Sequence, residues 1–185
     1  MKRSIALFAA ALVAGCASPV GPREADVYFI LEAAPAAPAA TAVSVAATSA
    51  AGFYDTQDIV YSRAPGTRGY YQFNHWTERP QRAIQAQLAA RLENGGARSG
   101  LVLSTHLDEI YHDAAQAPGT ARIALSARLV DPASGAVLAR RSFVRSAPAA
   151  SNDAAGAVRG FNQALGALLD DVAAWVAAEA KAAGK

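Results

Sequence analysis

Cysteine is almost absent from this sequence, since Cys16 is the only one among 185 residues. A single thiol cannot form a disulfide within the chain, and it cannot supply the thiolates of a cysteine-rich zinc site. Charge is also scarce: Asp, Glu, Lys and Arg make up 17% of the residues, and the formal net charge is +2. So small a positive charge argues against electrostatic binding of nucleic acid.

Catalytic sequence motifs are missing as well. No serine lies in a G-x-S-x-G sequence, no glycine-rich phosphate-binding loop is present, and no histidine has H-E-x-x-H spacing. His106 and Asp108 would share one face of a strand, close to His112 and Asp113, which favours a polar strand end over a metal site. We therefore expect no catalytic residue, no metal and no cofactor. A hydrolase with an unrecognised acid–base pair is the enzyme-class alternative.

Hydrophobic residues, in contrast, make up 52% of the chain, and many of them are alanine. Such a composition argues against intrinsic disorder. The length suits one domain, and a domain of ~150 residues buries ~70% of its unfolded surface.

The first sixteen residues, MKRSIALFAAALVAGC, have the pattern of a bacterial lipoprotein signal. Two basic residues precede an unbroken apolar run at residues 5–14. This run is shorter than the ~20 residues of a membrane-spanning helix, but it suits a signal peptide. Residues 13–16 (VAGC) resemble a lipobox, in which small residues precede the cysteine.

We predict that Cys16 is the lipidation site, where acyl chains such as palmitate hold the protein in a membrane leaflet. An ordinary secretory signal with a chance cysteine, or a buried free thiol, are the alternatives. The next residue is Ala17 and not Asp, which by analogy with enterobacterial lipoproteins predicts the outer membrane, facing the periplasm, over the inner membrane. The predicted organisation is a signal peptide at 1–15, a lipidated cysteine and tether at 16–25, a domain at 26–180 and a frayed tail at 181–185.

Seven segments have the composition or alternation of β-strands, and two have a helical pattern. Strands are expected at residues 26–31, 42–48, 58–63, 69–73, 101–110, 122–130 and 136–144. Helices are expected at residues 77–94 and from Ser151 or Asn152, as cap, to about 180. This order predicts a mixed α/β (α+β) domain in which two helices pack on a central mixed sheet. The segment 70–110 would form a right-handed crossover if both of its strands share the sheet.

Residue spacing predicts which side chains face the core. In the first helix, Ile84, Leu88 and Leu92 form one apolar stripe. The second helix has a corresponding apolar stripe, formed by Phe161, Leu165, Leu168, Val172 and Trp175. We expect its tryptophan to lie in the core. The inward side chains of the strand at 122–130 are Ile123, Leu125, Ala127 and Leu129.

Two irregularities are also predicted. Ile110 breaks the alternation of its strand, which places a bulge or strand end near Asp108. Residues 131–135 (DPASG) have turn composition and should join the last two strands in a hairpin.

Aromatic residues gather at 70–76, where Tyr70, Tyr71, Phe73 and Trp76 accompany His75. Such side chains suit the packing of a strand on a helix, and they also suit surfaces that meet a partner. The candidates for contact with a partner or with lipid are Tyr70, Tyr71 and Trp76.

These features occur along the chain in an order that is typical of a known family. The lipobox is followed by I-V-Y-x-R at residues 59–63, paired aromatics at 70–71, W-x-x-x-P at 76–80 and a late hairpin. Together they resemble the ABC-type transport auxiliary lipoprotein component family, which includes PqiC-like proteins and the lipoproteins that accompany MlaD-type MCE transporters. The glycine-rich segment 95–100 departs from the aromatic residue and valine that the family tends to show there.

The resemblance implies a non-catalytic accessory lipoprotein in a system that moves phospholipids or other hydrophobic molecules across the cell envelope. It implies an MCE-domain protein with its ABC permease and ATPase as partners, and it leaves open direct binding of phospholipid and homo-oligomerisation. A lipoprotein that assists a secretion, pilus or lipopolysaccharide-export complex is the binding-class alternative. A periplasmic hydrolase is the enzyme-class alternative.

Overall fold

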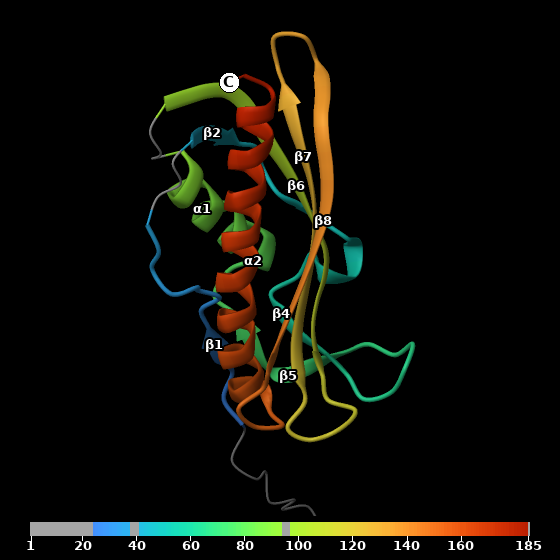
Figure 1. Cartoon of the computed structure of the whole chain (residues 1–185). Helices are drawn as coiled ribbons and strands as arrows, with labels where there is room; N and C mark the ends of the chain where they lie inside the picture. Colours follow the sequence, from blue (N-terminus) through green and yellow to red (C-terminus); the bar gives the residue numbers. More distant parts are fainter. Residues whose placement is uncertain (1–23, 38–40, 94–96, 185) are drawn as a thin grey trace, which may run out of the picture.

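The computed structural model describes residues 24–37, 41–93 and 97–184 of the chain (Figure 1). Cys16 and the predicted signal peptide therefore lie outside the described residues. The described strands and helices are β1 (Val27–Phe29), β2 (Thr41–Val45), β3 (Ser49–Ala50), the 3-10 turn η1 (Gly52–Tyr54), β4 (Asp58–Ser62), β5 (Gly69–Trp76), α1 (Pro80–Leu92), β6 (Ala97–Asp113), β7 (Thr120–Asp131), β8 (Ala136–Pro148) and α2 (Ala154–Ala182).

The described strands form one mixed sheet, which confirms the predicted fold class. The long strands β6, β7 and β8 make an antiparallel meander. The other edge of β6 is shared by β2, β3 and β4, which pair with it in parallel, one after another. β5 then pairs antiparallel with β4, and β1 pairs in parallel with β5.

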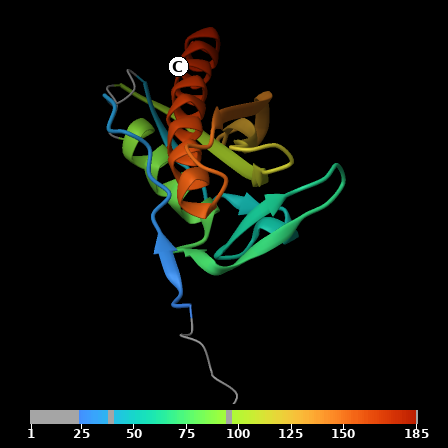
Figure 2. The ribbon, with the colours of Figure 1, turned by 90° about the horizontal axis from the view of Figure 1, so that it is seen from below.

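Both helices cover the same face of this sheet. α2 runs along β7 and β8, and α1 packs beside it over β2 (Figure 1). The β4–β5 hairpin projects away from the helices, as the view from below shows (Figure 2). One end of β5 therefore lies under the helices, while its other end has no helix above it.

The predicted core positions are confirmed. All of the residues predicted to face inward from the two helices and from β7 are at most 5% exposed. Trp175 contacts Phe143 of β8 edge to face, with ring centroids 5.7 Å apart. Full burial of one such apolar side chain contributes about 1.5–3 kcal/mol, so this layer between α2 and the sheet contributes substantially to stability.

The predicted bulge and hairpin are also confirmed. The register of β6 against β7 shifts between Leu107 and Glu109, at the position where the alternation breaks. Residues 131–135 form the β7–β8 turn, in which the Gly135 N–H donates to the Asp131 carbonyl oxygen at 2.8 Å. Gly135 has a φ of 71°, a conformation that glycine adopts without steric cost.

The predicted crossover over residues 70–110 is wrong. β4 lies between β5 and β6, and it is antiparallel to β5 but parallel to β6. β5 and β6 therefore run in opposite directions, so the handedness rule for parallel strands does not apply.

Several predicted boundaries shift for reasons of hydrogen bonding. Backbone bonds from Trp76 N–H to Gln57 and from Thr77 N–H to Phe29 extend β5, so that α1 begins only at Pro80. The segment predicted as a strand at 42–48 ends at Val45, and a separate short strand follows at residues 49–50.

The ends of α2 also differ from the prediction. Its N-cap is Asp153, whose Oδ1 accepts the Gly156 N–H at 2.7 Å, and neither Ser151 nor Asn152 takes that position. At the other end the helix continues to Ala182, because Ala180 is fully buried against the core.

Candidate functional site

The three aromatic candidates of β5 lie in three different environments. Trp76 is 1% exposed, and its ring meets Phe161 of α2 edge to face at 5.5 Å. It is therefore a core residue, and it offers no surface to a partner or to lipid. Tyr71 is half-buried, whereas Tyr70 is 42% exposed. Trp76 is at the end of β5 that meets Phe161 of α2, and the register of β5 against β4 shifts between Tyr70 and His75, so the alternation along β5 is interrupted before Trp76.

Tyr71 belongs to a buried hydrogen-bond network. Its hydroxyl lies 2.8 Å from His112 Nδ1, and His112 Nε2 lies 3.1 Å from the Pro118 carbonyl oxygen. Because a carbonyl oxygen can only accept, Nε2 must carry the hydrogen, and Nδ1 then accepts from the Tyr71 hydroxyl. This assignment holds for the neutral imidazole, in which only one ring nitrogen carries a hydrogen.

Burial acts on both groups in the direction that this assignment requires. Desolvation lowers the pKa of His112, which is fully buried, and it raises the pKa of Tyr71 to about 12. Both groups are therefore neutral at physiological pH. Each already has its hydrogen-bond partner within the fold, which makes the network a structural one.

The I-V-Y-x-R segment packs against the same part of β5. Ile59 is fully buried, and the Tyr61 ring lies 4.9 Å from the ring of Tyr71. The Arg63 guanidinium lies 4.8 Å from the centre of the Tyr61 ring, within cation–π distance. The motif therefore anchors the β4–β5 hairpin.

An exposed aromatic pair lies beside that hairpin, with Phe53 in η1 and Tyr70 in β5. The rings of Phe53 and Tyr70 stack with centroids 4.7 Å apart and an interplanar angle of 11°. The Tyr70 hydroxyl donates to the Phe53 carbonyl oxygen at 3.2 Å, which holds the two residues together. Phe53 is 40% exposed, so the pair presents an ordered apolar surface.

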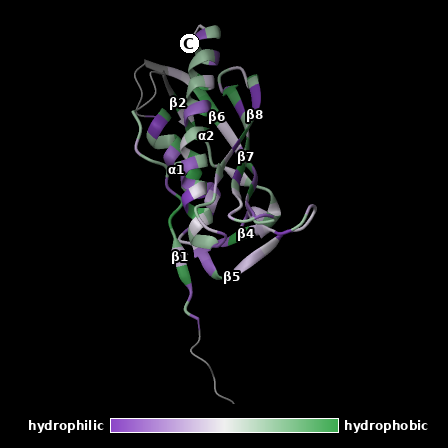
Figure 3. Cartoon of the chain, turned by 60° about the horizontal axis from the view of Figure 1, so that its bottom comes forward, coloured by the Kyte–Doolittle hydropathy of each residue, from purple (hydrophilic) through white to green (hydrophobic). Residues whose placement is uncertain are grey.

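A second exposed apolar group lies at the start of the described chain. Val27, Tyr28 and Ile30 are between 46% and 61% exposed, and they lie in or next to β1 (Figure 3). No helix in the described part of the chain combines the length and hydropathy needed to cross a membrane.

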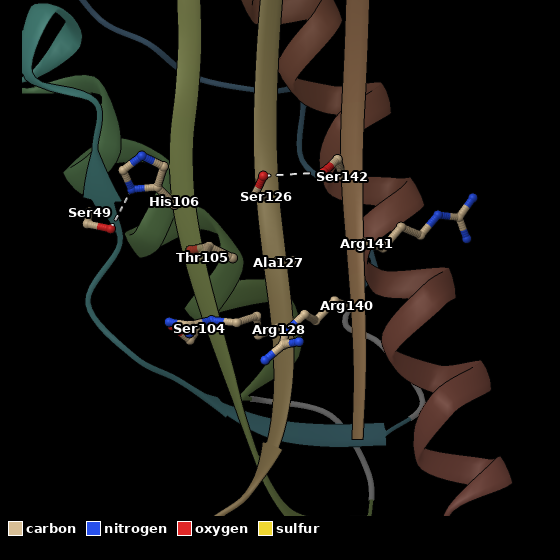
Figure 4. Close-up of a pocket in the computed structure, with 10 residues that line it drawn as sticks. All are labelled: Ser49, Ser104, Thr105, His106, Ser126, Ala127, Arg128, Arg140, Arg141 and Ser142. Atoms are coloured by element: carbon tan, nitrogen blue, oxygen red, sulfur yellow. Dashed lines mark hydrogen bonds between the residues drawn. The ribbon is translucent and has the colours of Figure 1, made fainter. Parts of the chain in front are cut away.

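A hollow of about 510 Å³, bordered mainly by serine, arginine and histidine residues, lies on the face of the meander opposite α2 (Figure 4). Its lining includes two rows of side chains, and each row is a set of cross-strand neighbours on β6, β7 and β8. The first row is Ser104, Arg128 and Arg140, and the second is His106, Ser126 and Ser142. The sequence signal for these residues is their position between inward-facing ones, since Arg128 and Ser126 alternate with the buried Leu125, Ala127 and Leu129.

One group beside the second row, Ser49–His106–Asp108, superficially resembles a Ser-His-Asp arrangement. Ser49 Oγ lies 2.7 Å from His106 Nδ1, but His106 Nε2 is 4.0 Å from Asp108 Oδ1, which is beyond hydrogen-bond distance. Asp108 instead accepts a 2.7 Å hydrogen bond from the Ser126 hydroxyl. The imidazole is thus not oriented by the carboxylate as a general base requires.

The histidines near this strand do not assemble a metal site. His112 is fully buried, whereas the His106 side chain is 42% exposed. Within residues 24–37, 41–93 and 97–184, no group of three or more His, Cys, Asp or Glu side chains could hold a metal ion.

Known structures share this fold. A Xanthomonas campestris protein, XCC0632, is 22% identical, with a TM-score of 0.74 over 85% of this chain and 99% of its own. A second, uncharacterized protein is 13% identical, with a TM-score of 0.65 over 83% of this chain and 99% of its own. No curated protein sequence matches the chain significantly.

The family model described as "ABC-type transport auxiliary lipoprotein component" matches residues 30–173, which include every described strand from β2 to β8, both helices up to the last turns of α2, and the Phe53–Tyr70 pair. The chain belongs to this family of transport auxiliary lipoproteins.

Proposed function

We propose that this lipoprotein is a non-catalytic, periplasm-facing accessory subunit of an MCE-type ABC system that transports phospholipids or other hydrophobic molecules, anchored through Cys16 in the outer membrane. The observation that carries the proposal is the family match over residues 30–173. The site geometry supports it, because the buried Tyr71–His112 pair is held by the fold and the Ser49–His106–Asp108 group lacks a catalytic alignment.

The exposed residues at β1 support a membrane-proximal position for that end of the domain. The chain from Cys16 to Glu24 can span at most about 30 Å. Val27, Tyr28 and Ile30 follow directly, and a tyrosine among apolar side chains suits the boundary between lipid and water. The carboxyl end of α2 lies at the opposite end of the molecule (Figure 1). With ~1.5 Å of rise per residue, the 29-residue α2 would place that end ~40 Å further from the membrane.

The Phe53–Tyr70 pair is the part of the domain that we assign to partner contact. Ordered aromatic side chains dominate binding energy at many interfaces, since they bury a large area at small entropic cost. Tyr70 is in β5 and Phe53 is in η1, beside the β4–β5 hairpin that projects away from both helices (Figure 2), and both side chains are at least 40% exposed to a partner.

The test is affinity purification of the lipidated protein from mildly solubilised membranes, with mass spectrometry of the proteins that copurify. We expect recovery of an MCE-domain protein with an ABC permease and ATPase. Replacing Phe53 and Tyr70 together by alanine should reduce that recovery. Leu138→Ala removes a side chain of similar exposure, 40%, from the β7–β8 end, and it should leave recovery unchanged.

Two outcomes would contradict the proposal. Recovery of a secretion, pilus or lipopolysaccharide-export component in place of the MCE protein would favour the binding-class alternative. An activity that is lost on changing one polar residue, with folding intact, would favour a periplasmic hydrolase.

The anchor has its own test. Cys16→Ala should leave the folded domain unchanged but release the protein from membranes after a high-salt wash, because the acyl chains would no longer be attached. A variant that still fractionates with membranes after the wash would show that lipid on Cys16 is not the anchor.

A further inference from the structure

Two arginines on the open face of the meander are direct neighbours across the sheet. Arg128 of β7 and Arg140 of β8 are direct cross-strand partners. In that position the Cβ atoms of two side chains lie about 5 Å apart, and like charges destabilise the sheet. Within the described part of the chain, neither guanidinium forms an ion pair, whereas Arg122 binds Glu109 at 3.1 Å and Arg145 binds Asp171.

Both arginines line the hollow of about 510 Å³. Their side chains extend along the sheet over the neighbouring strands, while Arg141, which also borders the hollow, directs its guanidinium away from it, to 5.2 Å from the centre of the Phe143 ring (Figure 4). Ser104 is the cross-strand partner of Arg128, and it places a small hydroxyl side chain at the same level of the sheet. The first row therefore combines two guanidiniums and one hydroxyl, all of them hydrogen-bond donors.

We propose that this hollow binds a phosphate group through Arg128, Arg140 and Ser104. A guanidinium binds phosphate oxygens in a bidentate manner, and two of them offer more N–H donors than the two oxygens of a carboxylate can accept. The volume is within the ~300–1,000 Å³ of small-molecule sites, so it leaves space for the organic part of a phosphate ester beside the anion.

The neighbouring carboxylate confines the anion to the first row. Asp108 lies next to the second row, where it accepts the Ser126 hydroxyl and approaches His106 to 4.0 Å. Its charge disfavours a phosphate over Ser126 and Ser142. Arg128 and Arg140 lie one level away along the sheet, where their two positive charges attract an anion.

This inference goes beyond the proposed transport function, and it does not depend on the identity of the transport partner. The phosphate could belong to a phospholipid headgroup or to a soluble phosphate ester. The experiment therefore compares four probes: inorganic phosphate, glycerol 3-phosphate, dihexanoylphosphatidylglycerol below its micelle concentration, and acetate.

The protein used is the chain from Ala17 onward, because every described strand and helix begins after Glu24 and is retained. Binding is followed by NMR chemical-shift titration at low salt, since exposed charges are screened at high salt. The variants are Arg128→Gln and Arg140→Gln. The control is Arg82→Gln, which removes the same charge from an exposed position on α1.

We expect the phosphate probes to shift the amide signals of β7 and β8 around residues 128 and 140. Loss of either arginine should weaken binding about tenfold, the effect of one charge-assisted hydrogen bond, and Arg82→Gln should bind as the parent does. Tighter binding of the short-chain lipid than of glycerol 3-phosphate would assign the site to a lipid headgroup, and equal binding would assign it to soluble esters.

Three results would overturn the proposal. The first is the absence of binding by all phosphate probes. The second is equal weakening by Arg82→Gln, which would show attraction to net charge only. The third is equally strong binding of acetate, which would indicate a surface for an acidic protein segment.

Discussion

Gly119 closes the loop between β6 and β7 directly beside His112, and we expect its replacement by alanine to disrupt the buried Tyr71–His112 network. Its φ is 87°, a conformation that costs an L-residue about 1–2 kcal/mol. A Cβ at this position would lie 2.2 Å from His112 Nε2 and 2.5 Å from the Asp113 carbonyl oxygen. Both distances are far below contact distance, so the imidazole must move.

The magnitude follows from what His112 loses. Movement of the ring breaks its 3.1 Å hydrogen bond to Pro118 and leaves a buried N–H without an acceptor, which costs about 1–3 kcal/mol. Together with the backbone conformation, Gly119→Ala should lower the free energy of unfolding by about 2–5 kcal/mol. That is a large fraction of the ~5–15 kcal/mol of a typical domain.

Gly135 provides a matched control. Its φ is 71°, but no atom lies within 4 Å of the position of a Cβ. Gly135→Ala should therefore cost only the backbone part, about 1–2 kcal/mol. Urea unfolding measures both variants through the fluorescence of Trp76 and Trp175, which are both buried and report loss of the core.

The comparison is decisive in either direction. If Gly119→Ala destabilises the protein no more than Gly135→Ala, the loop does not press against His112 and the assigned network is wrong. A double-mutant cycle with His112→Ala refines the test, since the part of the cost that arises from the imidazole should disappear in that background.

Three further predictions concern stability. Burial lowers the pKa of His112, so the unfolded chain takes up a proton below pH ~6.5 that the folded chain resists. The contribution of neutral His112 to the free energy of unfolding should therefore be fully present above that pH and should be lost below it. The urea midpoint of His112→Gln should fall less steeply with acidification than that of the parent protein. Parallel slopes would refute the assignment. Asp153→Ala should lower the free energy of unfolding by about 0.5–2 kcal/mol, because it removes the N-cap of α2. In the same urea series, Asp153→Asn should retain most of the stability that the cap contributes. Phe161→Ala should lower the free energy of unfolding, measured by calorimetry, by about 3–5 kcal/mol. Tyr70→Ala should lower it clearly less, because Tyr70 is exposed. Similar losses would mean that Tyr70 is part of the core.

Local patterns predicted the elements and their inward faces because those depend on residues close in sequence. The alternation at Ile123, Leu125 and Leu129 reflects the burial of these side chains under α2. The interrupted alternation at Ile110 reflects an extra residue, a bulge, in β6. The order of the strands in the sheet, in contrast, does not depend on residues close in sequence. β2, β3 and β4 share one edge of β6, an arrangement made by contacts between distant segments, and no local period contains it.

The candidate site shows the same limit. Tyr70 and Trp76 have the same parity in the sequence, but the register of β5 against β4 shifts between them, since Asp58 pairs with His75 and Val60 pairs with Tyr70. This interruption of the alternation, together with the contact between Trp76 and Phe161 of α2, buries Trp76 and leaves Tyr70 exposed, and no local pattern predicts either. For Arg128 and Arg140, the hairpin was predicted, but their pairing follows from a register that includes a shift between Leu129 and Val130.

The surfaces of this domain are separate enough to be tested one at a time. The buried Tyr71–His112 pair has its bonding requirements met within the fold, so binding must depend on exposed groups. Three such groups lie on different elements: the apolar residues at β1, the Phe53–Tyr70 pair beside the β4–β5 hairpin, and the arginines of the meander's open face. If they act as proposed, variants at each should impair one property alone, in turn membrane approach, partner recovery and phosphate binding. Loss of all three from a single surface substitution would mean that the fold had failed, because no side chain is shared among them.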